Sequence, residues 1–170
     1  MTFAECVQGL IAGDFTRLAP LFESEPDGRE CQIIRWYEAD LFRHEPKALA
    51  EAFSCACFNG FVFVVTYFLN HGLDPNGGAN TGMNAFHWAT DRGQLEVVKI
   101  LIEHHAALET RNMYGGTVLS GTVWSALNAR RPQHLEIIEA LLRAGARVDA
   151  VDFPSGDAEV DDLLRRFFLD

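Results

Sequence analysis

The chain has 170 residues, of which 48% are hydrophobic and 22% are charged, the balance of a globular protein with a sizeable core. Its formal net charge of −10 argues against binding to nucleic acid or to anionic membranes, because both need clustered lysine and arginine side chains. The acidity either serves solubility, which is the interpretation we favour, or matches a basic partner. No stretch approaches the roughly 20 apolar residues that span a bilayer, and the N-terminal residues lack the basic segment of a secretory signal.

Four cysteines in a chain of this length are too few for a disulfide scaffold. Cys55 and Cys57 are separated by about 200° around a helix, so both thiolates do not easily reach one metal ion. We therefore expect the thiols to be reduced and to pack as small apolar groups, with no metal and no cofactor bound. The expected location is cytoplasmic.

Two amphipathic helices are predicted before the repeated part of the chain. The first has apolar residues at helical spacing and is followed by a turn at Gly13 and a short second helix, so residues 1–23 are predicted to be an N-terminal cap. The other amphipathic helix lies in an insertion at residues 24–45. The apolar residues of the first helix are Phe3, Val7, Leu10 and Ile11, and those of the second are Ile33, Ile34, Tyr37 and Leu41.

A quartet of apolar residues spaced i, i+1, i+4, i+5 then recurs, first after 33 residues and next after 40. This spacing lines one face of a helix. Gly72 and Gly145 follow two of the quartets, at the position where a helix ends in a left-handed residue, and His105 stands there in the middle unit. Each unit cannot bury its apolar face alone and must stack on its neighbours. The quartets are Val64, Val65, Phe68 and Leu69; Val97, Val98, Leu101 and Ile102; and Ile137, Ile138, Leu141 and Leu142.

Residues 82–110 read GMNAFHWATDRGQLEVVKILIEHHAALET. This stretch closely resembles the ankyrin pattern G-x-T-P-L-H-x-A-A-x-x-G-H-x-E-V-V-x-L-L-x-x-G-A-x-x-N, and the period of 33 is also the ankyrin one. The organisation resembles small bacterial ankyrin proteins. The resemblance implies an all-α ankyrin-repeat solenoid of stacked helix-turn-helix units with capping helices at both ends.

In this alignment the chain is a single domain, residues 1–170. Repeat 3 carries seven extra residues, which fall before Pro132 and lengthen its first helix or the turn after it. Pro132 is expected in the first turn of the second helix, and Ser155 is expected to cap the last helix. The predicted parts are repeat 1 at 46–78, repeat 2 at 79–111, repeat 3 at 112–151 and a C-terminal cap helix at 152–170.

The resemblance implies a structural role for His87, which stands at the histidine of the family's T-P-L-H motif and would hydrogen-bond backbone to hold neighbouring loops. Ser54 and Ser120 stand at the equivalent positions. We interpret His71 and His104 as helix caps rather than metal ligands, because a helix C-terminus favours a cation. No nucleophile or phosphate-loop motif is present, so the chain is not predicted to be an enzyme.

Binding is implied across the concave face, which is made of the loop tips and the exposed side of the first helices. We expect Tyr114 at a loop tip to contact a partner, because it has little core to enter and tyrosine is enriched at binding hot spots. Core packing is the competing interpretation for Trp88 and Trp124. The predicted contact residues are Phe58, Asn80, Thr81, Met83, Trp88, Asp91, Arg92, Met113, Tyr114 and Trp124.

Arg130 and Arg131 are a basic pair in an acidic chain. They form either a docking spot or an ordinary solvated turn, and we favour the turn. The predicted function is a monomeric, non-catalytic module that binds another protein, and neither nucleic acid nor membrane. The alternatives are a small-molecule or metal-responsive sensor, and a structural scaffold without a specific partner.

Overall fold

The structure is a computed structural model that describes residues 1–24 and 31–168. These residues form helices and loops and no strand. The α-helices are α1 (Phe3–Ala12), α2 (Phe15–Leu18), α3 (Gln32–Glu38), α4 (Pro46–Asn59), α5 (Val62–Asn70), α6 (Ala85–Asp91), α7 (Leu95–Glu103), α8 (Val118–Asn128), α9 (His134–Arg143) and α10 (Ala158–Phe168). The 3-10 helices are η1 (Ala19–Leu21), η2 (Leu41–His44) and η3 (Val148–Ala150).

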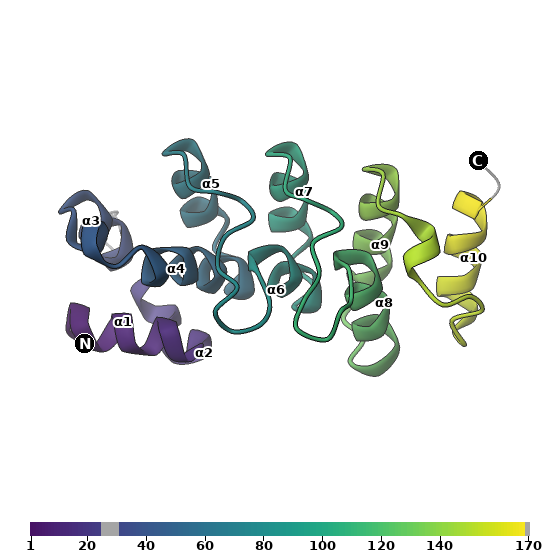
Figure 1. Cartoon of the computed structure of the whole chain (residues 1–170), viewed down its shortest axis with the longest axis horizontal. Coiled ribbons are helices and arrows are strands. Elements are labelled where there is room, and N and C mark those ends of the chain that lie inside the picture. Colours follow the sequence, from purple (N-terminus) through teal and green to yellow (C-terminus); the bar gives the residue numbers. More distant parts are fainter. Residues whose placement is uncertain (25–30, 169–170) are drawn as a thin grey trace.

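The helices stack in two layers along the long axis of the molecule (Figure 1). Helices α1, α4, α6 and α8 pack in one layer, and α5, α7 and α9 pack in the other. Helix α10 packs against α9 and closes the C-terminal end. The prediction of an all-α solenoid of stacked helix pairs is confirmed.

The core lies between the two layers, and the predicted quartets on α5, α7 and α9 contribute to it. All twelve of these residues are buried except Ile102, which is partly buried and packs against the core. Burying a side chain of this size contributes about 1.5–3 kcal/mol, so neighbouring helix pairs stabilise one another across each shared interface.

The predicted helix stops are also present. Gly72 and Gly145 have φ values of 83° and 100°, and His105 has a φ of 58°. This left-handed backbone is costly for a residue with a Cβ atom, so the middle unit carries a strained stop where the other two units have glycine.

The seven extra residues of the third unit extend both its first helix and the following turn. Helix α8 has 11 residues, whereas the equivalent α6 has 7. The expectation that Pro132 lies in the first turn of α9 is wrong, because α9 begins at His134. The His134 amide donates to the Arg131 carbonyl oxygen at 3.2 Å, so Pro132 is the second residue of a four-residue turn, where its fixed φ is favoured.

Leu41 does not belong to the helix predicted in the insertion. Ile33 and Ile34 are buried in α3, but α3 ends before Asp40, which has a left-handed φ of 58°. Leu41 then begins η2 and is 43% exposed. One left-handed residue has therefore rotated Leu41 out of the apolar stripe.

The cap of α10 is Asp157 rather than the expected Ser155. The Asp157 carboxylate accepts the amides of Glu159 and Val160 at 3.0 Å each. The Ser155 hydroxyl instead donates to the Asp161 carboxylate at 2.7 Å. A carboxylate satisfies free amides at a helix start and also complements the helix dipole.

None of the described helices is both long enough and apolar enough to span a membrane.

Candidate partner-binding groove

The side of the molecule that carries the loops before α6 and α8 contains a hollow of about 670 Å³. Its walls come from α6, from α8 and from two loops, the first finger loop (residues 71–84) and the second finger loop (residues 104–117). We call this hollow the α6–α8 groove. Four of the ten predicted contact residues line it, namely Met83, Asp91, Tyr114 and Trp124.

His87 lies at the wall of the groove and is 2% exposed. Its Nδ1 lies 2.7 Å from the Asn84 side-chain oxygen. Burial lowers the pKa of His87, and the backbone of Gly116 and Thr110 in the second finger loop opposes this shift. Nε2 has no hydrogen-bond partner of good geometry among the described residues. His87 is therefore a buried histidine in its neutral form, whose ring bonds the Asn84 side chain and is influenced by the backbone of the neighbouring finger loop.

Ser54 performs the loop-holding role that the motif implies. Its buried hydroxyl donates to the Gly78 carbonyl oxygen at 3.1 Å, which links α4 to the first finger loop. Ser120 bonds only locally, because its hydroxyl donates to the Thr117 carbonyl oxygen at 3.3 Å in the preceding turn of α8.

The tip of the second finger loop is fixed in place. Asn112 accepts the amides of Tyr114 and Gly116 at 3.0 Å each through its side-chain oxygen. The Met113 amide donates to the Gly82 carbonyl oxygen at 2.8 Å, which joins the two finger loops. The side chains of Met113 and Tyr114 are 67% and 82% exposed. A rigid backbone thus holds two large apolar side chains in solvent.

The polar residues of the first finger loop are engaged within the molecule. Thr81 accepts the indole N–H of Trp88 at 3.1 Å. The Asn80 amide donates to the Glu51 carboxylate at 2.7 Å, and the Asn80 side chain donates to the Ile11 carbonyl oxygen at 2.9 Å. Asn80 and Thr81 therefore order the loop that carries Met83.

Trp88 is half-buried in an aromatic cluster. Its ring centroid lies 5.8 Å from that of Phe15 and 5.3 Å from that of Phe58, both in edge-to-face geometry. The Arg92 guanidinium carbon lies 4.4 Å from the centroid of the Phe58 ring. Phe58, Trp88 and Arg92 thus join α2, α4 and α6, and they do not line the groove.

Trp124 has the opposite environment and is 63% exposed on α8. Core packing, the competing interpretation for this residue, is therefore not what the structure shows. Beside it, the groove is open at Gly121, where an added Cβ would meet nothing closer than 3.7 Å.

Gly121 and Ser125 line the groove but were not predicted. The signal was in the repeat register, because Gly121 lies 33 residues after Trp88 and Trp124 lies 33 residues after Asp91. Trp88 carries an indole in the second unit, whereas Gly121 at the equivalent position of the third unit has no side chain. That exchange opens the space beside Trp124.

The cysteines and capping histidines lie outside the groove. Burial raises the pKa of Cys6 to about 11 and raises the pKa of Cys55 and Cys57 further, so these thiols are protonated at neutral pH. His71 and His104 are C-cap residues, as expected. No group of three metal-ligating side chains occurs within the described part of the chain.

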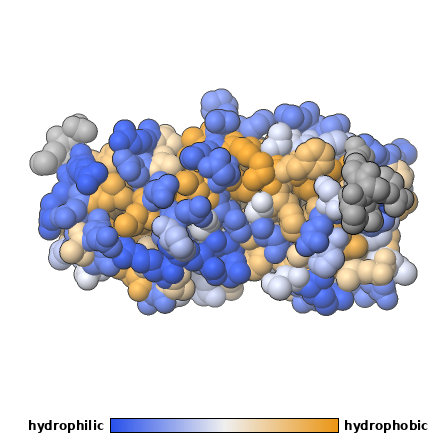
Figure 2. All heavy atoms as spheres, turned by 180° about the vertical axis from the view of Figure 1, so that it is seen from behind, coloured by the Kyte–Doolittle hydropathy of each residue, from blue (hydrophilic) through white to orange (hydrophobic). Residues whose placement is uncertain are grey.

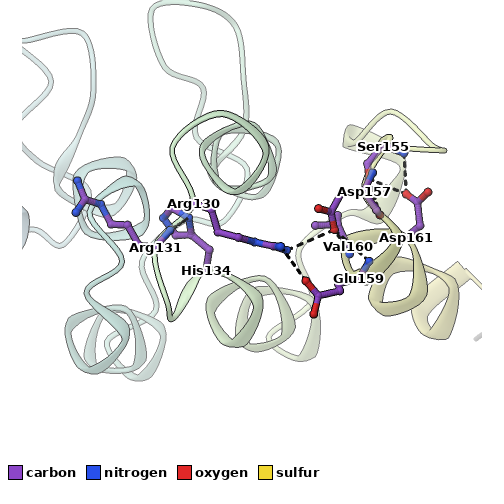
Figure 3. A network of polar contacts seen from close by, with 8 residues as sticks. All are labelled: Arg130, Arg131, His134, Ser155, Asp157, Glu159, Val160 and Asp161. Atoms are coloured by element: carbon purple, nitrogen blue, oxygen red, sulfur yellow. Dashed lines mark hydrogen bonds and ion pairs between the residues drawn. The ribbon is translucent and has the colours of Figure 1, made fainter.

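Arg130 and Arg131 point in different directions from the turn between α8 and α9 (Figure 3). Arg130 lies 3.4 Å from the Asp157 carboxylate and 2.8 Å from the Glu159 carboxylate, which ties the turn to the start of α10. Arg130 is therefore an exposed residue of a solvated turn, the interpretation we favoured, and its ion pairs tie that turn to α10.

Exposed apolar surface also occurs on the far side of the molecule, where orange areas interrupt the hydrophilic surface (Figure 2). On α5, Val62 and Phe63 are 40% and 57% exposed. Apolar exposure alone therefore does not single out the groove. What distinguishes the groove is a hollow walled by exposed aromatic side chains and a rigid loop.

Stacked helix pairs with loops projecting from one edge define a helical repeat solenoid. The sequence pattern of ankyrin repeats (three copies) matches residues 31–112 and again residues 53–152. The matches span more than half of the sequence, and the chain belongs to the ankyrin-repeat family. Ankyrin repeats are generally protein–protein interaction modules, and the family is typically non-catalytic. No curated protein matches the sequence.

Proposed function

We propose that the chain is a non-catalytic module that binds another protein in the α6–α8 groove. The observation that carries this proposal is the pair of exposed aromatic side chains on a preformed hollow, Tyr114 from the second finger loop and Trp124 from α8. Tyrosine and tryptophan are the residues most enriched at binding hot spots. A large exposed aromatic side chain gains most when a partner covers it.

The groove is held in shape before any partner binds. The finger loops are joined by the bond from Met113 to Gly82, and α6 is joined to α8 by the Ser125 hydroxyl, which donates to Asp91 at 2.7 Å. Preorganisation of this kind reduces the entropy that binding costs. A hollow of about 670 Å³ fits a few apolar side chains of one partner segment.

The hydroxyl groups of the groove are arranged for structure rather than for acyl transfer. The Ser125 hydroxyl donates to Asp91, the Ser120 hydroxyl to the Thr117 carbonyl oxygen, and the Thr90 hydroxyl to the His87 carbonyl oxygen. None of these bonds activates a nucleophile through an imidazole, which such catalysis requires. The groove is therefore proposed to bind a partner and not to catalyse a reaction.

The partner is proposed to be a protein and not nucleic acid, and the free chain is proposed to be a cytoplasmic monomer. Four buried free cysteines support a reducing compartment. Light scattering of the purified chain would test the monomer, and cell fractionation would test the location.

The test compares capture of host proteins by the wild-type chain, by the double variant Tyr114→Ala with Trp124→Ala, and by Phe63→Ala. Phe63 is the matched control, since it is an exposed aromatic residue on the other helix layer. We expect the groove variant to bind the captured protein about tenfold or more weakly, as for lost hot-spot residues, and Phe63→Ala to bind as the wild type does. Unchanged capture by the groove variant, with circular dichroism showing all proteins folded, would reject the groove.

A further inference from the structure

Two arginines close to the Asp91 end of the groove have no ion-pair partner within the described residues. Arg92 follows Asp91 at the end of α6, and Arg131 lies in the lengthened turn after α8. Most of the other described arginines are paired, and Arg35, Arg111 and Arg166 are the further ones without a carboxylate partner among the described residues. Those with a carboxylate partner within 4 Å are Arg17, Arg43, Arg130, Arg143, Arg147 and Arg165.

Both unpaired side chains are held by packing. The Arg92 guanidinium lies over the Phe58 ring at 4.4 Å. The Arg131 stem lies against Gly93, where a Cβ atom would stand 3.1 Å from both Cβ and Cδ of Arg131. Gly93 is the residue after Arg92, so packing brings the stem of Arg131 beside the end of α6. Figure 3 shows Arg131 directed away from Arg130 and its carboxylate partners.

The polar atoms of this pair are only partly satisfied. The Nε of Arg131 is buried and has no hydrogen-bond partner among the described residues. Burial and the nearby charge of Arg131 both lower the pKa of Arg92, and Asp91 opposes them. One oxygen of Asp91 is already bonded to Ser125. Two like charges held together are relieved when an anion binds between them.

We infer that Arg92 and Arg131 bind a carboxylate of the partner protein, from an aspartate or glutamate next to the apolar residue that fills the α6–α8 groove. Guanidinium groups suit this role, because their planar N–H donors match a carboxylate in pairs. Asp91 is the one acidic side chain of the groove wall and disfavours the carboxylate, so the anion is expected on the Arg92 side of Asp91. This inference rests on the proposed function and specifies the chemistry of the bound segment.

The test selects random linear peptides displayed on phage against the wild-type chain and against variants. Arg92→Met with Arg131→Met removes both charges but keeps the apolar stems that pack on Phe58 and Gly93. Arg166→Met is the matched control, since Arg166 is an exposed arginine on α10 with no ion pair in the described structure. Gly121→Leu fills the groove and identifies the peptides that depend on it. Circular dichroism and melting curves establish that each variant is folded, and Arg131→Lys restores one charge if the double variant unfolds.

We expect groove-dependent peptides to be enriched in aspartate and glutamate beside apolar residues. A selected peptide should bind the double variant about tenfold more weakly and Arg166→Met equally well. Groove-dependent peptides without acidic enrichment, or with lysine and arginine instead, would overturn this inference and leave the proposed function standing. Acidic enrichment that persists in peptides selected on the folded double variant would also overturn this inference and leave the proposed function standing. If no selected peptide depends on the groove, the proposed function fails and the inference fails with it.

Discussion

The Ser125 hydroxyl donates to the Asp91 carboxylate at 2.7 Å and ties α8 to the end of α6. Asp91 also accepts the imidazole N–H of His134 through its carbonyl oxygen at 3.1 Å. Asp91 thus bonds to both α8 and α9, the two helices of the third unit. The shape of the groove depends on this junction between the second and third units.

Ser125→Ala should lower the free energy of unfolding by about 1–2 kcal/mol, because a hydrogen bond to a carboxylate is lost and Asp91 is left without that donor. Urea denaturation measures the change. Ser120→Ala is the matched control, since its hydroxyl bonds only within its own turn. Equal stability of the two variants would show that the bond between Ser125 and Asp91 does not hold the groove.

Glu51→Gln should stabilise the chain at pH 7. Glu51 is 1% exposed, burial raises its pKa, and one of its oxygens has no partner among the described residues. A carboxyl group whose folded pKa lies above its unfolded value costs stability as the pH rises through the folded pKa. The neutral amide avoids that cost and should raise the free energy of unfolding by about 1 kcal/mol at pH 7.

The advantage of Glu51→Gln should shrink as the pH falls toward the ordinary glutamate value of about 4.5. Denaturation curves between pH 7 and pH 4.5 would measure it. A variant that is less stable than the wild type by the same amount at every pH would contradict the assigned direction.

The wild-type chain should lose stability on mild acidification. His134 is fully buried, its Nδ1 accepts the Arg131 amide, and its Nε2 therefore carries the hydrogen that Asp91 accepts. Burial lowers the pKa of both His134 and His87. A histidine whose folded pKa lies below its unfolded value resists protonation in the folded state, so stability falls as the pH drops below about 6.5.

Melting temperatures measured from pH 7.5 to pH 5.5 would follow this effect, and the same series in a Glu51→Gln background would remove the opposing contribution of Glu51, whose pKa burial raises. His134→Gln should flatten the dependence, at a cost in stability at pH 7. A wild-type melting temperature that stays level or rises over this range would show that these histidines do not control it.

Arg130→Met should loosen the attachment of α10 without unfolding the solenoid. The two ion pairs of Arg130 are partly exposed, so each is worth at most about 1 kcal/mol. Hydrogen exchange should accelerate at the start of α10 and remain unchanged in α6. Arg143→Met, which removes an ion pair within α9, serves as the control and should leave exchange in α10 unchanged.

The repeat architecture could be predicted from the sequence because its signals are local. The spacing of each quartet selects one face of a helix, and the left-handed stops at Gly72 and Gly145 act within a few residues. Leu41 and Pro132 were misplaced because a left-handed Asp40 and a turn closed by His134 change the local register.

The fate of the two tryptophans could not be predicted, because it depends on residues distant in the sequence. Phe15 of α2 covers one side of Trp88, so this indole is half-buried. Trp124 instead faces space left open by Gly121. The partners of Arg130 lie 27 and 29 residues away in α10, which no local pattern reveals.

Gly121 offers the most direct test of groove binding. An alanine Cβ there would make only ordinary contacts at 3.7 and 4.0 Å, and alanine favours the helix by about 1 kcal/mol. Gly121→Ala should therefore fold and bind as the wild type does, whereas the leucine side chain of Gly121→Leu should occupy the groove. The measurement is the dissociation constant of the protein captured by the wild type, determined by calorimetry for both variants. We expect wild-type affinity for alanine and a loss of about tenfold or more for leucine. Equal affinity of two folded variants would rule out binding in the groove.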